Sequence, residues 1–348
     1  MKISRRLFLV GGTAVTAIVL GDLNKPRRSW AQASSVNLYS SRHYDTDDAL
    51  YDSFQSGRVN LIEAGASELI ERIKSEGSNS PADLLLTVDA GNLWQADQDG
   101  LFAPVDSEIL KQRIPANLRH PEGHWFGFSK RARVIYYNRD RVNPAELSTY
   151  EDLAAPKWEG RVLIRSSSNI YNQSLVASMI AAEGLDAAEA WAEGIVANFA
   201  RQPEGNDTAQ IQACAAGLGD VAIANSYYFA RLAKSDDPAD QAVVEKVGIF
   251  FPNQRRNQRG THVNISGGGV LANAPNRDAA IAFLEHLTSD QSQTYFAEGN
   301  NEYPVVEGVE LDPVLTSFGQ FREDELSVEE YGKNQAAAIQ LMDRVGWP

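Results

Sequence analysis

The chain of 348 residues has one cysteine, Cys214, so it cannot close an intramolecular disulfide. Cys214 lies in an apolar, helix-like stretch, residues 211–216, which is typical of a small buried side chain rather than a reactive thiol. A disulfide scaffold of the kind found in small secreted proteins is therefore excluded. The length is typical of two domains.

Motifs for catalysis are also lacking. The sequence contains no His-Glu-x-x-His, no phosphate-binding loop, no Gly-x-Ser-x-Gly and no Cys-x-x-Cys. The glycines at 267–269 precede Val270 and Leu271 without the strand–glycine–helix context of a dinucleotide fingerprint. We therefore expect a ligand-binding protein rather than an enzyme.

Positive charge is scarce. Lys and Arg number 32 against 46 Asp and Glu, which gives a formal charge of −14. Residues 1–33 hold six of the basic residues and one of the acidic ones, so the chain from residue 34 carries −19. Nucleic acid and anionic membranes attract clustered Lys and Arg, and this balance argues against both. It is compatible with a cationic ligand, but many exported proteins are equally acidic.

The first 33 residues have the features of an export signal. Lys2, Arg5 and Arg6 precede an apolar run, Leu7–Leu20, that is too short to span a bilayer. Residues 31–33, Ala-Gln-Ala, supply a cleavage site, and the twin arginine predicts export by the Tat pathway. An ordinary Sec signal is the alternative. We expect a periplasmic protein without a lipid anchor, because no cysteine lies near the cleavage site.

The following sequence alternates between strand and helix patterns. The expected strands are 36–39, 59–63 and 82–87, and the expected helices are 47–56 and 68–76. This alternation predicts a parallel sheet covered by helices. In such sheets, ligand sites form beyond the carboxyl ends of the strands.

A second alternation follows two consecutive strands. The expected strands are 125–128, 134–138, 161–165, 221–225, 248–251 and 263–271, and the expected helices are 171–182, 187–199, 208–217, 277–288, 291–298 and 327–345. Residues 144–160 are expected to form a loop with a short helix. We predict an α/β fold of two βα lobes joined by long crossover strands, with the ligand cleft between them. The expected N-terminal lobe is 34–131 with 265–310, and the C-terminal lobe is 132–264 with 311–348.

Aromatic side chains follow two of the expected strands. His43 and Tyr44 come just after the first strand, and Tyr227 and Tyr228 follow the strand expected at 221–225. Adjacent residues of a strand point to opposite faces, so both phenols reach one ion only where the strand has ended. A phenolate is a hard anionic oxygen donor, and Fe(III) is the small, highly charged cation that prefers several such donors. The pattern therefore points to a ferric site.

Four segments resemble the periplasmic substrate-binding proteins of ABC importers. Residues 148–160 resemble the segment that opens the second lobe in the branch for iron, polyamines and related cargo, and residues 300–305 resemble a late segment of that branch. Residues 39–47 and 225–232 resemble, more narrowly, the cyanobacterial ferric-binding proteins of the FutA/IdiA type. The resemblance extends from about residue 35 to 348 and implies the two-lobed periplasmic binding protein fold.

In that family, ferric iron is held in the cleft by tyrosines with one histidine nearby. The resemblance implies Fe(III) as bound cargo, with Fe(II) as a second ion to be tested. It implies a metal site of His43, Tyr44, Tyr171, Tyr227 and Tyr228. The position of Tyr171 is also explained by helix-capping neighbours without any function. Family members differ in whether the histidine at the position of His43 binds the ion directly.

The remaining histidines are expected to be structural. His120 and His124 share a loop at a spacing that suits a metal, but their aromatic and proline neighbours favour a solvated turn. We expect His262 at a strand entry near the hinge and His286 on a helix surface. In Tyr136-Tyr137, inside a strand, we expect one core side chain and one surface side chain.

The expected mechanism depends on charge. Free phenol titrates near pH 10, so iron must displace the tyrosine protons, and binding should weaken as the pH falls. Four phenolates on a trivalent ion leave an excess negative charge that Arg42, Arg131 or Arg231 is expected to offset. Ligands from both lobes should favour a closed state that docks on the membrane permease of an ABC importer. We expect a monomer.

Two other functions stay open from the sequence. One is a substrate-binding protein for an organic cation such as a polyamine, with the aromatic residues as a cation–π box. The other is a secreted non-haem iron enzyme. Against the enzyme, an ion saturated by phenolates lacks the open positions and the two-histidine–one-carboxylate set of oxygen chemistry.

Overall fold

The structure is a computed structural model that describes residues 34–44 and 46–348. Residues from Ser34 to Pro348 form one compact unit. The export signal expected at 1–33 lies outside the described residues. Within the described part, no helix combines the length and apolar character needed to cross a membrane.

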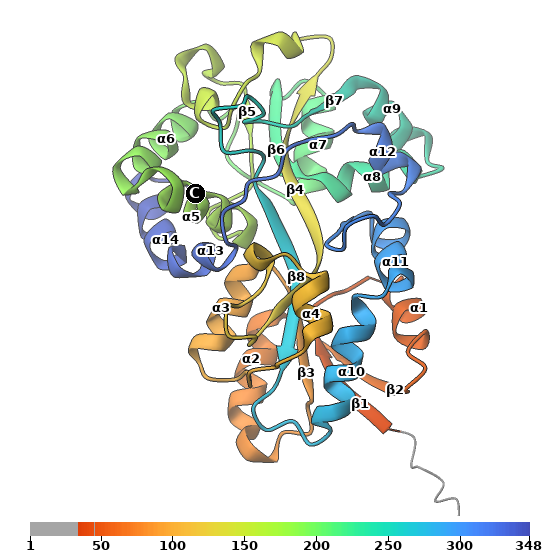
Figure 1. Cartoon of the computed structure of the whole chain (residues 1–348). Helices are drawn as coiled ribbons and strands as arrows, with labels where there is room; N and C mark the ends of the chain where they lie inside the picture. Colours follow the sequence, from red (N-terminus) through yellow and green to blue (C-terminus); the bar gives the residue numbers. More distant parts are fainter. Residues whose placement is uncertain (1–33, 45) are drawn as a thin grey trace, which may run out of the picture. The chain divides into compact units, whose positions relative to one another are not determined.

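Nine strands connect within the described residues (Figure 1). The strands are β1 Ser34–Ser40, β2 Gly57–Glu63, β3 Leu84–Val88, β4 Phe126–Asn138, β5 Val162–Leu163, β6 Val221–Asn225, β7 Val247–Phe250, β8 Val263–Val270 and β9 Tyr303–Pro304. β1 is parallel to both β2 and β3, and β5 is parallel to β6. β8 is antiparallel to β3 and β4, and β4 is antiparallel to β6 and β7. The parallel pairs confirm the expected βα units.

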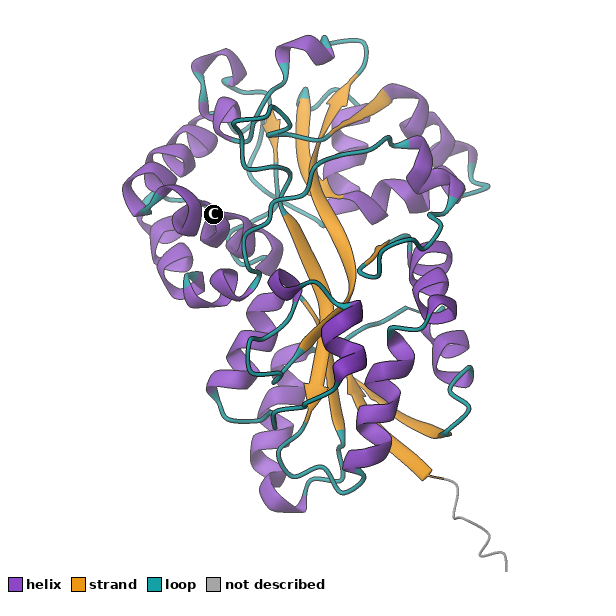
Figure 2. Cartoon of the chain, viewed as in Figure 1, coloured by secondary structure: helices purple, strands orange, loops and turns teal. Residues whose placement is uncertain are grey.

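Two long strands, β4 and β8, pair with each other in the middle of the sheet (Figure 2). β8 also pairs with β3, next to β1 and β2, and β4 also pairs with β6 and β7. The first half of β4 pairs with β8, and residues 133–137 pair with β6. The separate strands expected at 125–128 and 134–138 are therefore one strand of 13 residues. The apolar strand pattern is interrupted in the sequence by three polar residues, Ser129, Arg131 and Arg133, which predicted a gap between two strands. All three are buried in the structure, within the continuous strand β4.

Helices cover the strands, as Figure 2 shows. The α-helices are α1 Asp47–Asp52, α2 Ala66–Glu76, α3 Ala90–Gln98, α4 Glu108–Arg113, α5 Ile170–Glu183, α6 Leu185–Ala197, α7 Asp207–Ala215, α8 Ser226–Lys234, α9 Pro238–Lys246, α10 Arg277–Leu287, α11 Asp290–Asn300, α12 Pro313–Ser317, α13 Glu329–Lys333 and α14 Gln335–Arg344. Short 3-10 helices occupy Gly77–Asn79, Ala116–Leu118, Pro144–Glu146, Glu151–Ala154 and Pro156–Trp158. Most expected helices are present, but α3, α4, α8, α9 and α12 were not expected.

The helix expected at 327–345 is two helices. α13 and α14 meet at Asn334, whose backbone angles, φ −98° and ψ 0°, interrupt the helix. α13 packs against α3, and Gly332 makes the approach close. A Cβ added at Gly332 would lie 2.2 Å from the Cβ of Trp94. Tertiary packing thus fixes a break that the apolar pattern does not mark.

The glycines at 267–269 lie in β8, between β3 and β4. A Cβ at Gly269 would lie 2.1 Å from the carbonyl oxygen of His124, and one at Gly268 would lie 2.4 Å from that of Leu85. These glycines permit close approach of neighbouring backbone, which accounts for them without a nucleotide.

Candidate metal centre

Tyr44 lies in the turn between β1 and α1. The amide of Ser41 continues the strand ladder by donating to the carbonyl of Leu86 at 2.9 Å, and the carbonyl of Tyr44 accepts from the amide of Asp47 at 2.8 Å. Tyr44 thus follows the carboxyl end of a strand, where a ligand site is expected. Its neighbour His43 is exposed.

Tyr227 and Tyr228 occupy the first turn of α8. β6 ends at Asn225 and the helix begins at Ser226, so the expected strand end is confirmed and a helix follows it directly. The carbonyl of Asn225 accepts a hydrogen bond from the hydroxyl of Tyr136 at 3.2 Å, which fixes the junction. The rings of Tyr227 and Tyr228 lie 4.2 Å apart at 32°. The helix start lets both rings lie on one side of the chain.

Four phenols come together from three segments. The hydroxyl of Tyr227 donates to that of Tyr171, near the start of α5, at 3.3 Å. The ring of Tyr44 packs edge-on against that of Tyr227, with centroids 6.4 Å apart. The ring of Tyr228 lies against that of Tyr227 in a tilted arrangement. We call Tyr44, Tyr171, Tyr227 and Tyr228 the tyrosine cluster. No ring or hydrogen-bond contact joins His43 to this cluster among the described residues.

Guanidinium groups surround the tyrosine cluster. The central carbon of Arg42 lies 4.8 Å from the ring centroid of Tyr44, and that of Arg131 lies 5.6 Å from the centroid of Tyr171. Arg231, one turn beyond Tyr227 on α8, lies 5.0–5.8 Å from the rings of Tyr44, Tyr227 and Tyr228. Arg133 and Arg165 also approach the ring of Tyr171, at 6.0 and 5.8 Å. The cluster is therefore prepared to carry negative charge.

The cations differ in how far their charge is already paired. Arg42 is buried and paired with Asp47 at 2.8 Å and Glu302 at 3.2 Å. Arg131 is buried as well, and its Nη1 donates to the Ser266 hydroxyl at 3.1 Å. Its Nε and Nη2 have no hydrogen-bond partner within the described residues. Such a group has donors left for an anion that appears nearby.

Burial favours the protonated form of three phenols of the tyrosine cluster in the absence of metal. Loss of hydration raises the pKa of Tyr44, Tyr227 and Tyr228, to about 12 for Tyr228. The neighbouring phenol of Tyr171 raises the pKa of all three further, whereas Arg42 and Arg131 lower that of Tyr44. A cation that replaces the protons must therefore be strongly charged.

Two histidine predictions are wrong. His120 is buried, and both His120 and His124 contact Asp97 rather than forming a solvated turn. His286 is half-buried, with its Nε2 2.9 Å from the Ser53 hydroxyl, rather than on a helix surface. His262 is buried against the ring of Tyr331, with centroids 4.7 Å apart, as a structural residue would be. Tyr136 is in the core and Tyr137 is half-buried.

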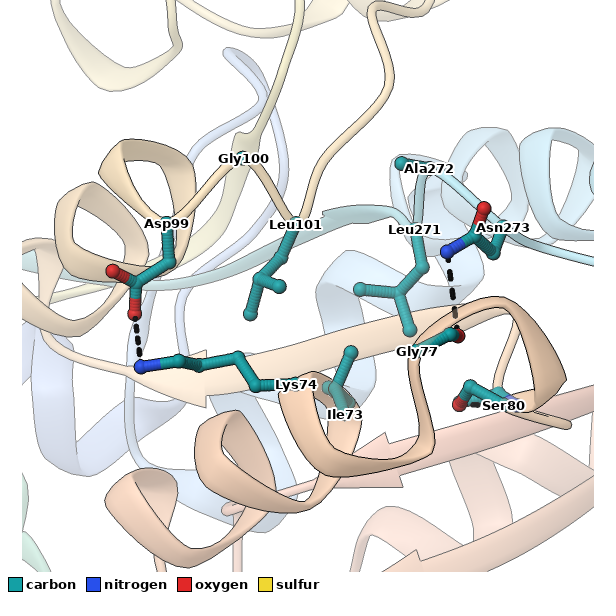
Figure 3. Close-up of a pocket in the computed structure, with 11 residues that line it drawn as sticks. Ile73, Lys74, Gly77, Ser80, Asp99, Gly100, Leu101, Leu271, Ala272 and Asn273 are labelled. Carbon is teal, nitrogen blue, oxygen red and sulfur yellow. Dashed lines mark hydrogen bonds and ion pairs between the residues drawn. The ribbon is translucent and has the colours of Figure 1, made fainter.

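A separate pocket lies beside α2 (Figure 3). Lys74 pairs there with Asp99 at 3.3 Å, and the side-chain amide of Asn273 donates to the carbonyl of Gly77 at 3.3 Å. None of the tyrosine cluster lines this pocket. Its polar groups pair with one another and offer no comparable set of donors.

Known proteins are similar to this chain over most of its length. Iron uptake protein A2 of Synechocystis is 66% identical, over 99% of both chains. The Fe(3+)-binding periplasmic protein of Serratia marcescens is 31% identical, over 91% of this chain and 93% of that protein. The solved structure of Trichodesmium IdiA (FutA) in complex with iron and citrate superposes with a TM-score of 0.88 at 64% identity, over 90% of this chain and 100% of that one.

The expected fold class and resemblance are confirmed by these similarities. The family model described as bacterial extracellular solute-binding protein matches residues 49–323. The chain belongs to this family and has its two-lobed α/β fold.

Proposed function

We propose that this protein captures ferric iron in the periplasm and delivers it to the permease of an ABC importer. The phenolate oxygens of the tyrosine cluster hold the ion, and His43, next to Tyr44 and exposed, is the fifth ligand. The observation that carries the proposal is the convergence of four phenols, two of them joined through their hydroxyls at 3.3 Å. Few ions other than Fe(III) prefer a set of several phenolate oxygen donors.

The relatives support iron as the cargo. Two of them are named for iron uptake and Fe(3+) binding, and a third structure was solved with iron and citrate. These relatives are transport proteins rather than enzymes, in keeping with the missing catalytic motifs. Export through the twin-arginine signal at 1–33 and a monomeric state belong to the same proposal.

The arrangement of cations disfavours the polyamine alternative. A polyamine would meet the guanidinium groups of Arg42, Arg131 and Arg231 around the same aromatic rings. Like charges in a partly buried site repel strongly. Ferric iron avoids this repulsion because the phenols lose their protons on binding, and the resulting negative charge is what the arginines then stabilise.

We further propose that iron draws two lobes together. The N-terminal lobe comprises 34–131 with 265–310, and the C-terminal lobe comprises 132–264 with 311–348. Tyr44 then belongs to the first lobe and Tyr171, Tyr227 and Tyr228 to the second. An ion bound by both favours the closed form by its differential affinity. Small-angle scattering should show a smaller radius of gyration with iron, and equal radii would contradict the closure.

The decisive experiment compares metal content and visible spectrum before and after removal of two hydroxyls. Tyr227→Phe with Tyr228→Phe should abolish ferric–phenolate colour and leave little bound iron. Tyr137→Phe with Tyr295→Phe removes the same number of hydroxyls away from the cluster and should keep both. Retention of iron and colour in the first variant would overturn the site assignment.

A further inference from the structure

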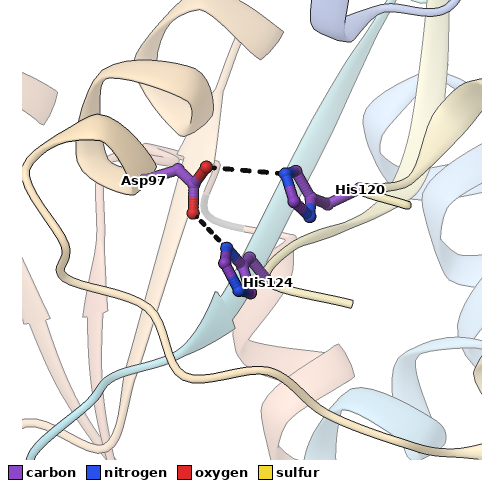
Figure 4. Close-up of side chains that lie close together, drawn as sticks. All are labelled: Asp97, His120 and His124. Atoms are coloured by element: carbon purple, nitrogen blue, oxygen red, sulfur yellow. Dashed lines mark hydrogen bonds and ion pairs between the residues drawn. The ribbon is translucent and has the colours of Figure 1, made fainter. Parts of the chain in front are cut away.

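A second group of metal-binding side chains lies on the segment that leads into β4. Asp97, in the last turn of α3, faces His120 and His124 (Figure 4). His124 Nδ1 lies 2.5 Å from Asp97 Oδ1, and His120 Nε2 lies 3.5 Å from Asp97 Oδ2. One potential ligand atom from each residue lies within 4.8 Å of the others.

The local backbone places the two imidazoles side by side. The amide of His120 donates to the carbonyl of Trp125 at 2.9 Å, and the amide of Gly123 donates to the carbonyl of His120 at 3.1 Å. This tight turn stacks the two rings with centroids 4.5 Å apart and planes 2° from parallel. The Nδ1 of His120 accepts from the amide of Glu122 at 3.1 Å, which leaves its Nε2 directed at Asp97. Both rings are thus held before any ligand arrives.

The donor atoms suit a divalent transition ion. On a tetrahedral zinc ion with bonds of about 2.0–2.1 Å, two ligand atoms lie roughly 3.3 Å apart. The spacing of 3.5 Å between His120 and Asp97 is already close to this value. The shorter 2.5 Å contact of His124 is a hydrogen bond, and it must open by less than about 1 Å when a metal replaces the shared proton.

Charge and access also suit a cation. Asp97 and Glu329 provide negative charge close to His120, and Glu122 Oε2 lies 4.0 Å from His124 Nε2. His124 is about one-quarter exposed and Glu122 is exposed, so the site can be reached from solvent.

We propose that Asp97, His120 and His124 form a second metal site, separate from the tyrosine cluster, that binds a divalent transition ion of the zinc class. Imidazole and carboxylate together suit such ions, whereas the tyrosine cluster suits trivalent iron. The bound ion ties the end of α3 to the turn that precedes β4. The role of this ion is to stabilise the contact between α3 and the turn before β4, and it takes no part in binding the cargo.

The test uses Zn(II) alone as the probe. In the Tyr227→Phe, Tyr228→Phe background, where the tyrosine cluster is disabled, titration calorimetry should detect one zinc ion per chain. Adding Asp97→Asn, which keeps the side-chain shape, should weaken zinc binding more than about tenfold. Adding His124→Ala should also weaken zinc binding more than about tenfold. Zinc should raise the melting temperature only of the protein that keeps both Asp97 and His124.

The matched control is His286→Ala, which removes a half-buried histidine far along the sequence from the proposed ligands. It should leave zinc binding unchanged. The proposal is overturned if no saturable zinc binding occurs, or if Asp97→Asn and His124→Ala bind zinc as tightly as the parent. Because the tyrosine cluster is disabled throughout, these outcomes do not depend on whether that cluster binds iron.

Discussion

The hydroxyl of Tyr227 donates a hydrogen bond to the hydroxyl of Tyr171 at 3.3 Å, although the two residues start different helices, α8 and α5. Without metal, this bond pairs the two hydroxyls, and burial raises the pKa of Tyr227. When both lose their protons, two adjacent oxygen anions remain and need a cation between them. Tyr171 and Tyr227 are therefore stable together as phenols, whereas as phenolates they need a bound cation to offset their repulsion.

Iron binding should release protons. Free phenol ionises near pH 10, and burial raises the pKa of Tyr44, Tyr227 and Tyr228 further, so iron binding through four phenolates at neutral pH expels about four protons per iron. The apparent affinity should accordingly fall as the pH falls. Calorimetry with ferric citrate in two buffers of different ionisation enthalpy measures the number. Tyr228→Phe should release about one proton fewer, and an unchanged count would show that this residue does not ligate iron.

Removal of the exposed Arg231 should weaken iron retention without unfolding the protein. Its guanidinium lies within 5.8 Å of three cluster rings and is positioned to stabilise phenolate charge. Arg231→Gln should lower the ferric affinity about three- to tenfold, measured by competition with citrate. Arg231→Lys keeps the charge and should lose less. The difference in ferric affinity between the parent and Arg231→Gln should shrink at high salt, where exposed charges are screened. Equal ferric affinities of the parent and Arg231→Gln at low salt would refute the role of Arg231.

The local pattern predicted the βα alternation and the end of β6, because buried strands are short apolar runs and the tyrosines follow one directly. It could not predict that α8 starts at once, since no loop residues mark the boundary between Asn225 and Ser226. Nor could it predict α3, which begins after Asp89 in a left-handed conformation with φ 78°. That cap depends on contacts from Ser174 and Asn264, far away in the chain.

The continuity of β4 was hidden for the same reason. Ser129 donates to Glu302 at 2.6 Å, and Arg133 pairs with Asp207 at 3.3 Å. These partners lie 173 and 74 residues away along the chain, so a local pattern reads the polar residues as a break. The site shows a similar limit: the tyrosine positions could be found from the sequence, but the buried Arg131 and its unpaired donors depend on the folded surroundings.

Alkaline pH should destabilise the metal-free protein through its buried phenols. An unfolded tyrosine ionises near pH 10, whereas in the fold the pKa of Tyr228 is raised to about 12. The native state therefore holds more protons between these values, and the free energy of unfolding falls as the pH rises through them. Tyr228→Phe should reduce the slope in this window by about 1.4 kcal/mol per pH unit.

Urea unfolding at pH 7 and at several points above pH 10 measures this slope. Near pH 7 the phenol is protonated in both states, so parent and variant should share the same pH dependence there. Parallel curves above pH 10 as well would mean that Tyr228 ionises as freely in the folded protein as in the unfolded chain.

A methyl group at Gly269 should destabilise the crossover strands. A Cβ there would lie 2.1 Å from the carbonyl oxygen of His124 and 2.7 Å from Cδ1 of Phe102. The carbonyl belongs to the backbone and cannot turn away as a flexible side chain would. Gly269→Ala should thus lower the free energy of unfolding by about 1–3 kcal/mol, measured with urea. Gly65→Ala, at φ −62° with nothing within 4 Å, is the control and should cost less than about 1 kcal/mol. Equal losses would show that β8 can move aside, and that Gly269 is not required for the close approach of the His124 backbone.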